Sequence, residues 1–527
     1  MLTGLVNGVI YVSFKPLRKV EALLIANGRV IYAGDREIVE AAINMLRGEL
    51  LDLCGRVVLP GFIDSHVHLD ELGMYLNTLD LRGVRSIAEL KEKLRRHAER
   101  KGATWILGHG WDQELFEEKR WPTRWDLDEV VGDRPVILTR VCLHAAVLNT
   151  KAMELTGLLN TESLNVVRDE RGVPTGIVKE EAFDNARERF KETLAESDYE
   201  KFIEDAARYT ASQGVTTVGF VSCDERSLKA LSKLKEEGRL PIRVRVYLSP
   251  GRQVYGRWEM LENLKRLGVR RGFGDDVLKI MGIKIVADGS LGARTAWLTK
   301  PYSDDPSTSG YPSISEETLE SIVKEAHEAG LQVAIHGIGD KAIDMILSVF
   351  RRLRDVKHRR HRIEHASVLR ENQVEEMSKL GITASVQPHF IITDWWAEKR
   401  LGKERVRWLY SFKTMMERGV VIGLGTDSPV EPLNPWETVY AAVTRGRYEG
   451  ISYYESTTKE SLTLEEALQA YTWGSAYIMF DEDLASLVEG KLADFIIINK
   501  DPFTIEEKEL KNIRILETYV GGRRVWP

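Results

Sequence analysis

Two histidines one residue apart, His66 and His68, are the residues of this chain best suited to chemistry. They end an apolar stretch, VVLPGFIDSHVHLD, that turns at Pro60-Gly61. Because side chains alternate faces along an extended strand, both imidazoles project to the same side. Two neutral imidazoles on one side can hold a single metal ion, whereas the structural alternative is a pair of buried, hydrogen-bonded histidines.

Four more candidate ligands stand at the ends of other apolar runs. They are Lys284 in GIKIVADGSLG, His336 in VAIHGIGD, His365 in RIEHA and Asp427 in GLGTDSPV. Four histidines and an aspartate suit zinc or another borderline divalent metal, bound as one ion or as a bridged pair. For Lys284 the alternative is a buried lysine paired with Asp288, which leaves a mononuclear site.

The elements that position these residues are strands alternating with amphipathic helices, the pattern of parallel βα units. Eight strands are expected, at residues 61–66, 215–221, 242–248, 282–287, 332–336, 362–365, 383–387 and 420–426. Eight such units predict an α/β fold with a (β/α)8 TIM-like barrel over residues 59–70 and 210–475. The carboxyl ends of barrel strands meet at one mouth, so the candidate ligands should converge there.

Residues 71–209 are too many for one helical crossover, and they predict a subdomain inserted after the first barrel strand. Such an insertion emerges at the mouth of the barrel, so we interpret it as a lid. The alternative for its four tryptophans is the core of an ordinary accessory domain. The two chain ends, residues 1–58 and 476–527, contain short apolar strands and turns such as Asn27-Gly28. We expect them to form one discontinuous β-sandwich.

We expect a soluble protein with a small-molecule substrate, since no run approaches the roughly 18 uninterrupted apolar residues that span a bilayer. The chain has 527 residues, and 74 Lys and Arg against 80 Asp and Glu give a formal net charge of −6. The sequence contains no basic stripe long enough to follow a row of phosphates, so we expect no binding to nucleic acid or to an acidic membrane. The short basic cluster at residues 357–362 is interpreted as a solvated loop. Three widely spaced cysteines without a Cys-x-x-Cys pair indicate a reducing cytoplasm. A homo-oligomer is left open.

The motifs that contain these candidate ligands resemble those of a known family, the amidohydrolase superfamily. Within it they resemble the branch that contains N-substituted formamide deformylases and uncharacterised relatives. The resemblance runs nearly from end to end, in PGFIDSHVHL, GVTTVGF, KIVADGSLGARTAWL, VAIHGIGDKAID, RIEHA, GLGTDSPVEPLNPW and EGKLADFIII. It is specific for the superfamily and the branch, and it does not identify the substrate.

The resemblance implies a role for each candidate ligand. It places His66 and His68 on one metal ion and His336 and His365 on the other, with Asp427 as a metal ligand that takes the proton of the attacking water. Lys284 matches a lysine that is carboxylated and bridges two ions in binuclear members. Glu180, in PTGIVKEEA, is an alternative ligand from the insertion, and we rank it below Lys284 because Lys284 lies on a predicted barrel strand.

The resemblance also indicates substrate contacts by Asp112 and His144, while Arg294 is a candidate anchor for a carboxylate or carbonyl group. Together these features predict a metal-dependent amidohydrolase, with zinc as the expected metal, that acts on carbon–nitrogen bonds other than peptide bonds. An N-substituted amide or formamide is the expected substrate. Two alternatives stay open, a metal-dependent isomerase or decarboxylase on the same barrel and a non-catalytic scaffold.

Overall fold

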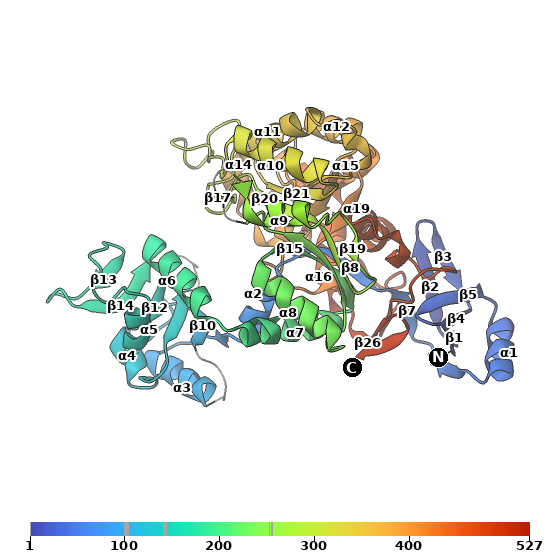
Figure 1. Ribbon diagram of the computed structural model, residues 1–527, viewed down its shortest axis with the longest axis horizontal. Helices are drawn as coiled ribbons and strands as arrows, with labels where there is room; N and C mark the ends of the chain where they lie inside the picture. The colour runs from blue at the N-terminus through green and yellow to red at the C-terminus, as the bar shows by residue number, and fades with distance from the viewer. Residues whose placement is uncertain (1, 100–104, 141–144, 252, 255–256) are drawn as a thin grey trace. The chain divides into compact units, whose positions relative to one another are not determined.

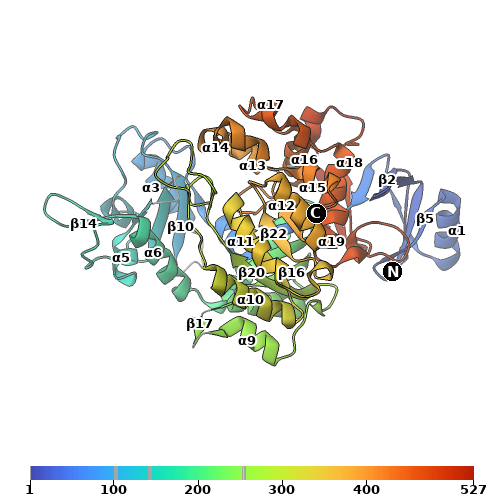
Figure 2. The same ribbon diagram turned by 90° about the horizontal axis from the view of Figure 1, so that it is seen from above.

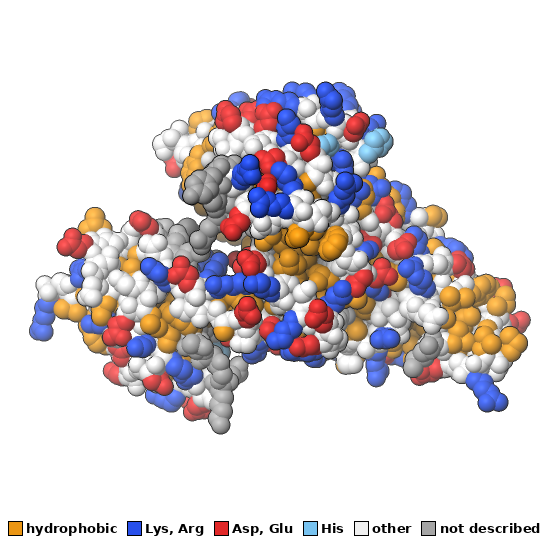
Figure 3. All heavy atoms as spheres, viewed as in Figure 1, with side chains coloured by type: hydrophobic (Ala, Val, Ile, Leu, Met, Phe, Trp, Pro, Cys, Tyr) orange, Lys and Arg blue, Asp and Glu red, His pale blue; other side chains and the backbone are white. Residues whose placement is uncertain are grey.

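The computed structural model describes residues 2–99, 105–140, 145–251, 253–254 and 257–527, apart from the side chains of residues 180, 184 and 188. The chain divides into two compact units, one of Met1–Leu72 with Ile203–Pro527 and the other of Gly73–Phe202. Among the described residues, none of the helices combines the length and apolar composition needed to cross a bilayer. Acidic and basic side chains are interspersed over the face seen in Figure 3.

The larger unit is built on a nearly closed barrel of eight parallel strands. Their order around the barrel follows their order in the chain. The strands are β8 (Phe62–Val67), β15 (Val215–Cys223), β16 (Arg243–Leu248), β20 (Leu278–Val286), β21 (Gln332–Gly337), β22 (Arg362–His365), β23 (Thr383–Val386) and β24 (Ile422–Leu424). All eight predicted barrel strands are therefore confirmed. The short strand β19 (Phe273–Gly274) pairs antiparallel with β20.

Amphipathic helices cover the barrel. In α10, Ser315 caps the first turn by accepting a hydrogen bond from the Thr318 backbone N–H, and Leu319, Ile322 and Val323 are buried. Helices α10, α11 and α12 lie together on the outside of the strands (Figures 1 and 2). The α-helices that follow β15 in this unit are α8 (Glu225–Glu236), α9 (Glu259–Arg266), α10 (Glu316–Glu328), α11 (Asp340–Arg351), α12 (Glu371–Leu380), α13 (Phe390–Thr393), α14 (Ala397–Arg405), α15 (Phe412–Glu417), α16 (Pro435–Thr444), α17 (Tyr454–Thr457), α18 (Leu464–Gln469) and α19 (Ser475–Ile478).

Strands from both ends of the chain share one sheet. Its order is β27 (Arg523–Trp526), β26 (Ile515–Val520), β25 (Phe495–Ile498), β7 (Val57–Pro60), β2 (Val9–Phe14) and β3 (Leu17–Val20). A second sheet has the order β5 (Arg29–Gly34), β4 (Ala22–Ala26), β1 (Leu2–Val6) and β6 (Glu49–Asp52). Buried side chains from both sheets belong to a single apolar cluster. The Arg243 guanidinium of β16 donates to both carboxylate oxygens of Asp494, at 2.6 and 2.9 Å, and so ties this region to the barrel.

Residues 36–46 form helix α1 (Arg36–Leu46), where the sequence was interpreted as strands only. Val39 and Ile43 lie four residues apart, are both buried and pack with Val6 and Leu24. Apolar residues at this spacing share one helix face. Only two buried positions define that face, so the helical period is weakly marked in the sequence.

The inserted unit has its own mixed sheet, in the order β13 (Val166–Arg168), β14 (Pro174–Lys179), β12 (Ala145–Leu148), β11 (Val136–Arg140), β10 (Ile106–Trp111) and β9 (Leu79–Asp80). Its helices are α3 (Ile87–Ala98), α4 (Arg124–Asp128), α5 (Thr150–Leu155) and α6 (Glu180–Thr193), and α2 (Leu69–Leu76) and α7 (Glu196–Ser212) cross its two boundaries. Two apolar clusters fill it, and Trp111 is fully buried in one of them. Trp111 is thus a core residue of this unit.

Candidate metal centre

His66 and His68 converge with Asp427 at the carboxyl end of β8. The Nε2 atoms of both histidines lie 3.2 Å from Asp427 Oδ1. One ligand atom from each of the three residues lies within 4.8 Å of the others. His66 is fully buried and Asp427 is 7% exposed, so water does not compete freely for these atoms. The His-x-His spacing therefore brings both imidazoles to the same carboxylate.

The backbone holds Asp427 against β8 and nearly closes the barrel. Asp427 N–H donates to the His66 carbonyl at 2.8 Å, and His68 N–H donates to the Ser428 carbonyl at 2.9 Å. Asp64 is not a member of the group, because its carboxylate accepts from the Thr426 hydroxyl at 2.7 Å and ties β8 to the loop after β24. Asp427 has a left-handed φ of 58°. Such backbone costs about 1–3 kcal/mol in a non-glycine residue and persists where its surroundings over-determine it.

His336 and His365 stand beside this group. The His365 ring centroid lies 5.0 Å from that of His66 and 4.5 Å from that of His336. Burial is the main cause that lowers the pKa of His336 to about 4 and the pKa of His365 well below its usual value. Both imidazoles are consequently neutral at pH 7, which is the form that binds metal.

Hydrogen bonds select which nitrogen of each ring is free. His66 Nδ1 pairs with Glu364 Oε2 at 2.5 Å, and His365 Nδ1 pairs with Gln387 Oε1 at 2.8 Å. Since a carboxylate and an amide oxygen can only accept, the protons lie on Nδ1 and leave the Nε2 lone pairs free. In His336 the two nitrogens exchange roles. Its Nε2 donates to the Gly289 carbonyl at 3.1 Å, so Nδ1 is the free nitrogen.

The donor set fits a divalent metal. His66 Nε2 is buried and makes no hydrogen bond to any described residue, although Asp427 Oδ1 is near. Orphaned buried nitrogens are rare in proteins and call for an explanation such as an ion. Imidazoles with one nitrogen oriented by an outer carboxylate or amide are characteristic of metal ligands. His66, His68, His336, His365 and Asp427 would hold the ion or ions.

The sequence did not lead us to Glu364 and Gln387, the partners of His66 and His365. The interpretation of residues 357–362 as a solvated loop is wrong for Arg362. Arg362 is fully buried, and its Nε and Nη2 donate to Glu364 at 2.5 and 3.0 Å. The signal was present in RIEHA, since two opposite charges two residues apart in an apolar strand share one face. His365 departs from that alternation because its φ is 70°.

Lys284 lies on β20 and lines the same cavity as the histidines. It is 5% exposed, and burial lowers its pKa. Asp288 accepts hydrogen bonds from the backbone N–H groups of Trp297, Ile338 and Gly339, at 2.8, 3.0 and 2.8 Å. No ion pair between Lys284 and Asp288, or between Lys284 and any other carboxylate, forms among the described residues.

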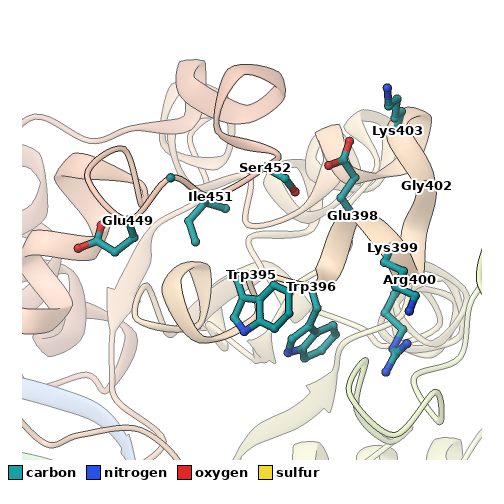
Figure 4. Close-up of a pocket in the computed structure, with 11 residues that line it drawn as sticks. Trp395, Trp396, Glu398, Lys399, Arg400, Gly402, Lys403, Glu449, Ile451 and Ser452 are labelled. Atoms are coloured by element: carbon teal, nitrogen blue, oxygen red, sulfur yellow. The ribbon is translucent and has the colours of Figure 1, made fainter.

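A cavity of about 460 Å³ opens over the ligands. Its lining includes Phe390, Asp394, Trp396 and Tyr410 besides His68, Lys284, His336, His365 and Asp427. Trp396 also borders a hollow of about 890 Å³ on the surface, where Figure 4 shows it beside Trp395. Besides the candidate ligands, the cavity is therefore lined by aromatic rings and by the carboxylates of Glu71 and Asp394.

The remaining predicted site residues either have partners of their own or lie outside the described residues. Asp112 belongs to the inserted unit, where its Oδ1 accepts from Arg140 Nη2 at 3.0 Å. Arg294 donates to Asp304 at 3.2 and 2.9 Å, although Leu291 and Gly292 just before it line the cavity. His144 lies outside the described residues, as does the side chain of Glu180, the first residue of α6. Their functional roles stay predictions.

A barrel whose strand ends gather histidines and an aspartate is the architecture of a metal-dependent hydrolase. An uncharacterised metal-dependent hydrolase from Pyrococcus horikoshii OT3 has a similar structure, with a TM-score of 0.86 and 44% identity over 96% of this chain and 99% of that one. The Bacillus subtilis (strain 168) amidohydrolase YtcJ is 32% identical over 540 residues, which cover 99% of this chain and 98% of that protein.

The model of the amidohydrolase family matches residues 49–526. The chain therefore belongs to the amidohydrolase family, and the resemblance noted in its motifs is confirmed. The N-substituted formamide deformylase of Arthrobacter pascens is a further relative, 26% identical over 531 residues that cover 95% of this chain and 94% of that protein.

Proposed function

We propose that this protein hydrolyses the C–N bond of an N-substituted amide or formamide. The observation that carries the proposal is the approach of one Asp427 oxygen to the Nε2 atoms of both His66 and His68, at 3.2 Å each. A divalent ion in such a site acts as a Lewis acid, polarising a carbonyl and lowering the pKa of water. The relationship to a formamide deformylase supports the amide as substrate.

Asp427 is the proton carrier in this proposal. Its carboxylate takes a proton from the attacking water and passes it to the leaving nitrogen, so that one amide and one water yield an acid and an amine. His66 and His365 hold their orientation through Glu364 and Gln387.

We also propose that the bound metal is zinc and that the protein works in a reducing cytoplasm. Imidazole nitrogens with one or two carboxylate oxygens are a donor set that suits zinc. Cys54 and Cys223 are free. Sparse, unpaired cysteines support a reducing compartment.

We propose further that Lys284 carries a carboxyl group on Nζ and bridges two ions. Its neutral amine adds to carbon dioxide and loses one proton, which gives a carbamate with one negative charge and two oxygens. The position of Lys284 in the cavity, without a carboxylate partner among the described residues, supports this assignment. A carbamate signal in the ¹³C NMR spectrum after exposure to ¹³CO₂, absent in Lys284→Ala, is the expected result. A short carboxylic acid should restore part of the metal content of that variant.

The inserted residues 71–209 are proposed to act as a lid that brings Asp112 and His144 to the substrate, with Arg294 as an anchor from the barrel. The support is connectivity, because a segment that follows a barrel strand starts at the mouth. His144→Ala should raise KM or lower kcat and leave the bound metal unchanged. Unaltered kinetics over a panel of substrates would return these residues to a structural role.

The experiment that tests the proposed function is a screen of N-substituted amides with the zinc-loaded full chain, followed by product analysis. Release of an acid and an amine is expected, whereas an isomer or carbon dioxide as product would favour the alternative chemistries. Asp427→Asn should lower kcat by on the order of 10²–10⁴-fold, the usual contribution of acid–base catalysis. Near-normal turnover in that variant would contradict the role of Asp427.

A further inference from the structure

Asp394 provides a carboxylate on the cavity wall that is not one of the candidate metal ligands. Asp394 follows helix α13 and lines the cavity together with Phe390. Its Oδ2 accepts a hydrogen bond from the Tyr410 hydroxyl at 2.6 Å. Oδ1 accepts none from the described side chains or backbone. One oxygen of a half-buried carboxylate is therefore left for a ligand.

The partner of Asp394 is held in a strained conformation. Tyr410 has a φ of 54°, which is unfavourable for a bulky residue. Its N–H donates to the Ser367 carbonyl at 2.8 Å, and its own carbonyl accepts from Arg445 Nη1 at 2.9 Å and from the Phe412 N–H at 2.8 Å. Arg445 is fully buried. These contacts offset the strain and fix the hydroxyl against Asp394, as expected of a constructed binding site.

Aromatic rings surround the carboxylate. Phe390, Trp396 and Tyr410 line the same cavity as Asp394. The face of an aromatic ring attracts a cation, and rings combined with a carboxylate are the chemistry by which proteins recognise ammonium groups. The Phe390 ring centroid lies 6.5 Å from that of His365, so this wall adjoins the metal ligands.

The neighbouring charges leave the carboxylate available. Glu431 and Arg400 act electrostatically on Asp394 with opposite signs. Arg400 is already paired with Asp304. Burial raises the pKa of Asp394 to about 7, and a bound cation would favour its ionised form. Lys284 and Glu71 line the same cavity, and Lys284 is assigned to the metal site.

We propose that Asp394, Tyr410, Phe390 and Trp396 form a binding site for an alkylammonium group, so that the substrate is an N-substituted amide that carries a basic amine. The inference rests on the proposed function, which makes the substrate an amide. What it adds is a positive charge on that substrate. The reacting carbonyl lies at the metal ligands while the ammonium group lies at Asp394. A neutral amide of the same length lacks the second interaction.

The first arm of the test measures binding without turnover. Choline is compared with 3,3-dimethylbutan-1-ol, its neutral carbon isostere, by calorimetry on the zinc-loaded full chain. A quaternary nitrogen has no lone pair for a metal, and both probes carry the same hydroxyl. Choline should bind at least tenfold more tightly than the isostere, and Asp394→Asn should remove most of that difference. Equal binding of the two probes to the wild type would overturn the inference.

The second arm measures specificity. N-formyl-1,4-diaminobutane and N-formylpentylamine are assayed as a matched pair, and the ratio of their kcat/KM values should fall by at least tenfold in Asp394→Asn. Trp396→Leu should lower the same ratio and serves if the first variant does not fold. Glu398→Gln is the control, because Glu398 borders the outer hollow and not the cavity. Metal content is measured in every variant.

The outcomes separate the two proposals. Hydrolysis of both amides with an unchanged ratio in Asp394→Asn would overturn the ammonium site and leave the proposed function standing. Choline binding that depends on Asp394, in a protein that hydrolyses no amide, would support the site and contradict the proposed function. A change of the ratio that Glu398→Gln reproduces would also overturn the inference, since it would show a general loss of negative charge.

Discussion

Replacing Glu364 with Gln removes the buried carboxylate that orients His66. Glu364 is fully buried, its Oε2 pairs with His66 Nδ1 at 2.5 Å, and both of its oxygens accept from Arg362. Glutamine has nearly the same shape but only one accepting oxygen. It cannot accept from the imidazole and bind both donors of the guanidinium. The substitution should therefore affect metal binding and stability together.

The two effects have different magnitudes. Loss of a partner that orients a metal-binding histidine typically lowers metal affinity by about 10–100-fold, which is about 1.4–2.8 kcal/mol. Breaking a buried ion pair leaves an uncompensated charge, here on Arg362, and costs about 3–5 kcal/mol. Burial opposes ionisation of Glu364, yet Arg362 and then His66 hold its pKa well below the usual value. Its stabilising contribution is thus complete above about pH 4.3, the pKa of an unfolded glutamate, and is lost only as the pH falls toward the depressed value.

A competition assay with a chromophoric chelator gives the zinc affinity, and thermal denaturation of the apoprotein gives the stability. The double variant Glu364→Gln/Arg362→Met is the matched control, because it removes the orphaned charge but not the defect at His66. It should regain part of the stability and none of the zinc affinity. If Glu364→Gln binds zinc as tightly as the wild type, then Glu364 does not orient His66 and the reasoning is wrong.

Three further predictions concern other parts of the molecule. Asp494→Ala should destabilise the protein by about 3–5 kcal/mol, because it leaves the buried Arg243 unpaired, and an unchanged melting temperature would contradict this. Gly282→Ala should cost more than the roughly 1–3 kcal/mol of ordinary overpacking, since the added Cβ would lie 1.8 Å from the Gln332 carbonyl oxygen; a normal yield of folded protein would refute it. Choline binding should weaken as the pH is lowered through about 7, because burial raises the pKa of Asp394 to about 7 and protonation removes its charge; calorimetry over this range measures it.

The barrel was predictable because its strands are buried on both faces and appear in the sequence as short apolar runs. Even so, two of the barrel strands depart most from their predicted bounds. β20 begins at Leu278, four residues before the predicted start at 282, and β24 covers only Ile422–Leu424 of the predicted 420–426. A strand starts and stops where its neighbours offer hydrogen bonds, and the composition of the run does not contain that information.

The candidate ligands were predictable from their place at strand ends, whereas their partners were not. Glu364 was visible as a charge in an apolar strand, but its contact with His66 joins residues 298 positions apart. The left-handed backbone of His365 also breaks the alternation from which its direction would be inferred. Asp394 and Tyr410 lie in connecting segments after β23, and their contact depends on how those segments fold over the barrel.

Hydrolysis is proposed to depend on a metal site formed by His66, His68, His336, His365 and Asp427. The most direct measurement is the metal content of the full chain, purified without chelators, determined by elemental analysis alongside turnover of an N-substituted amide. We expect about one or two equivalents of a divalent metal, and His66→Ala should lose both the metal and the activity. Metal far below one equivalent in a fully active protein would contradict the account.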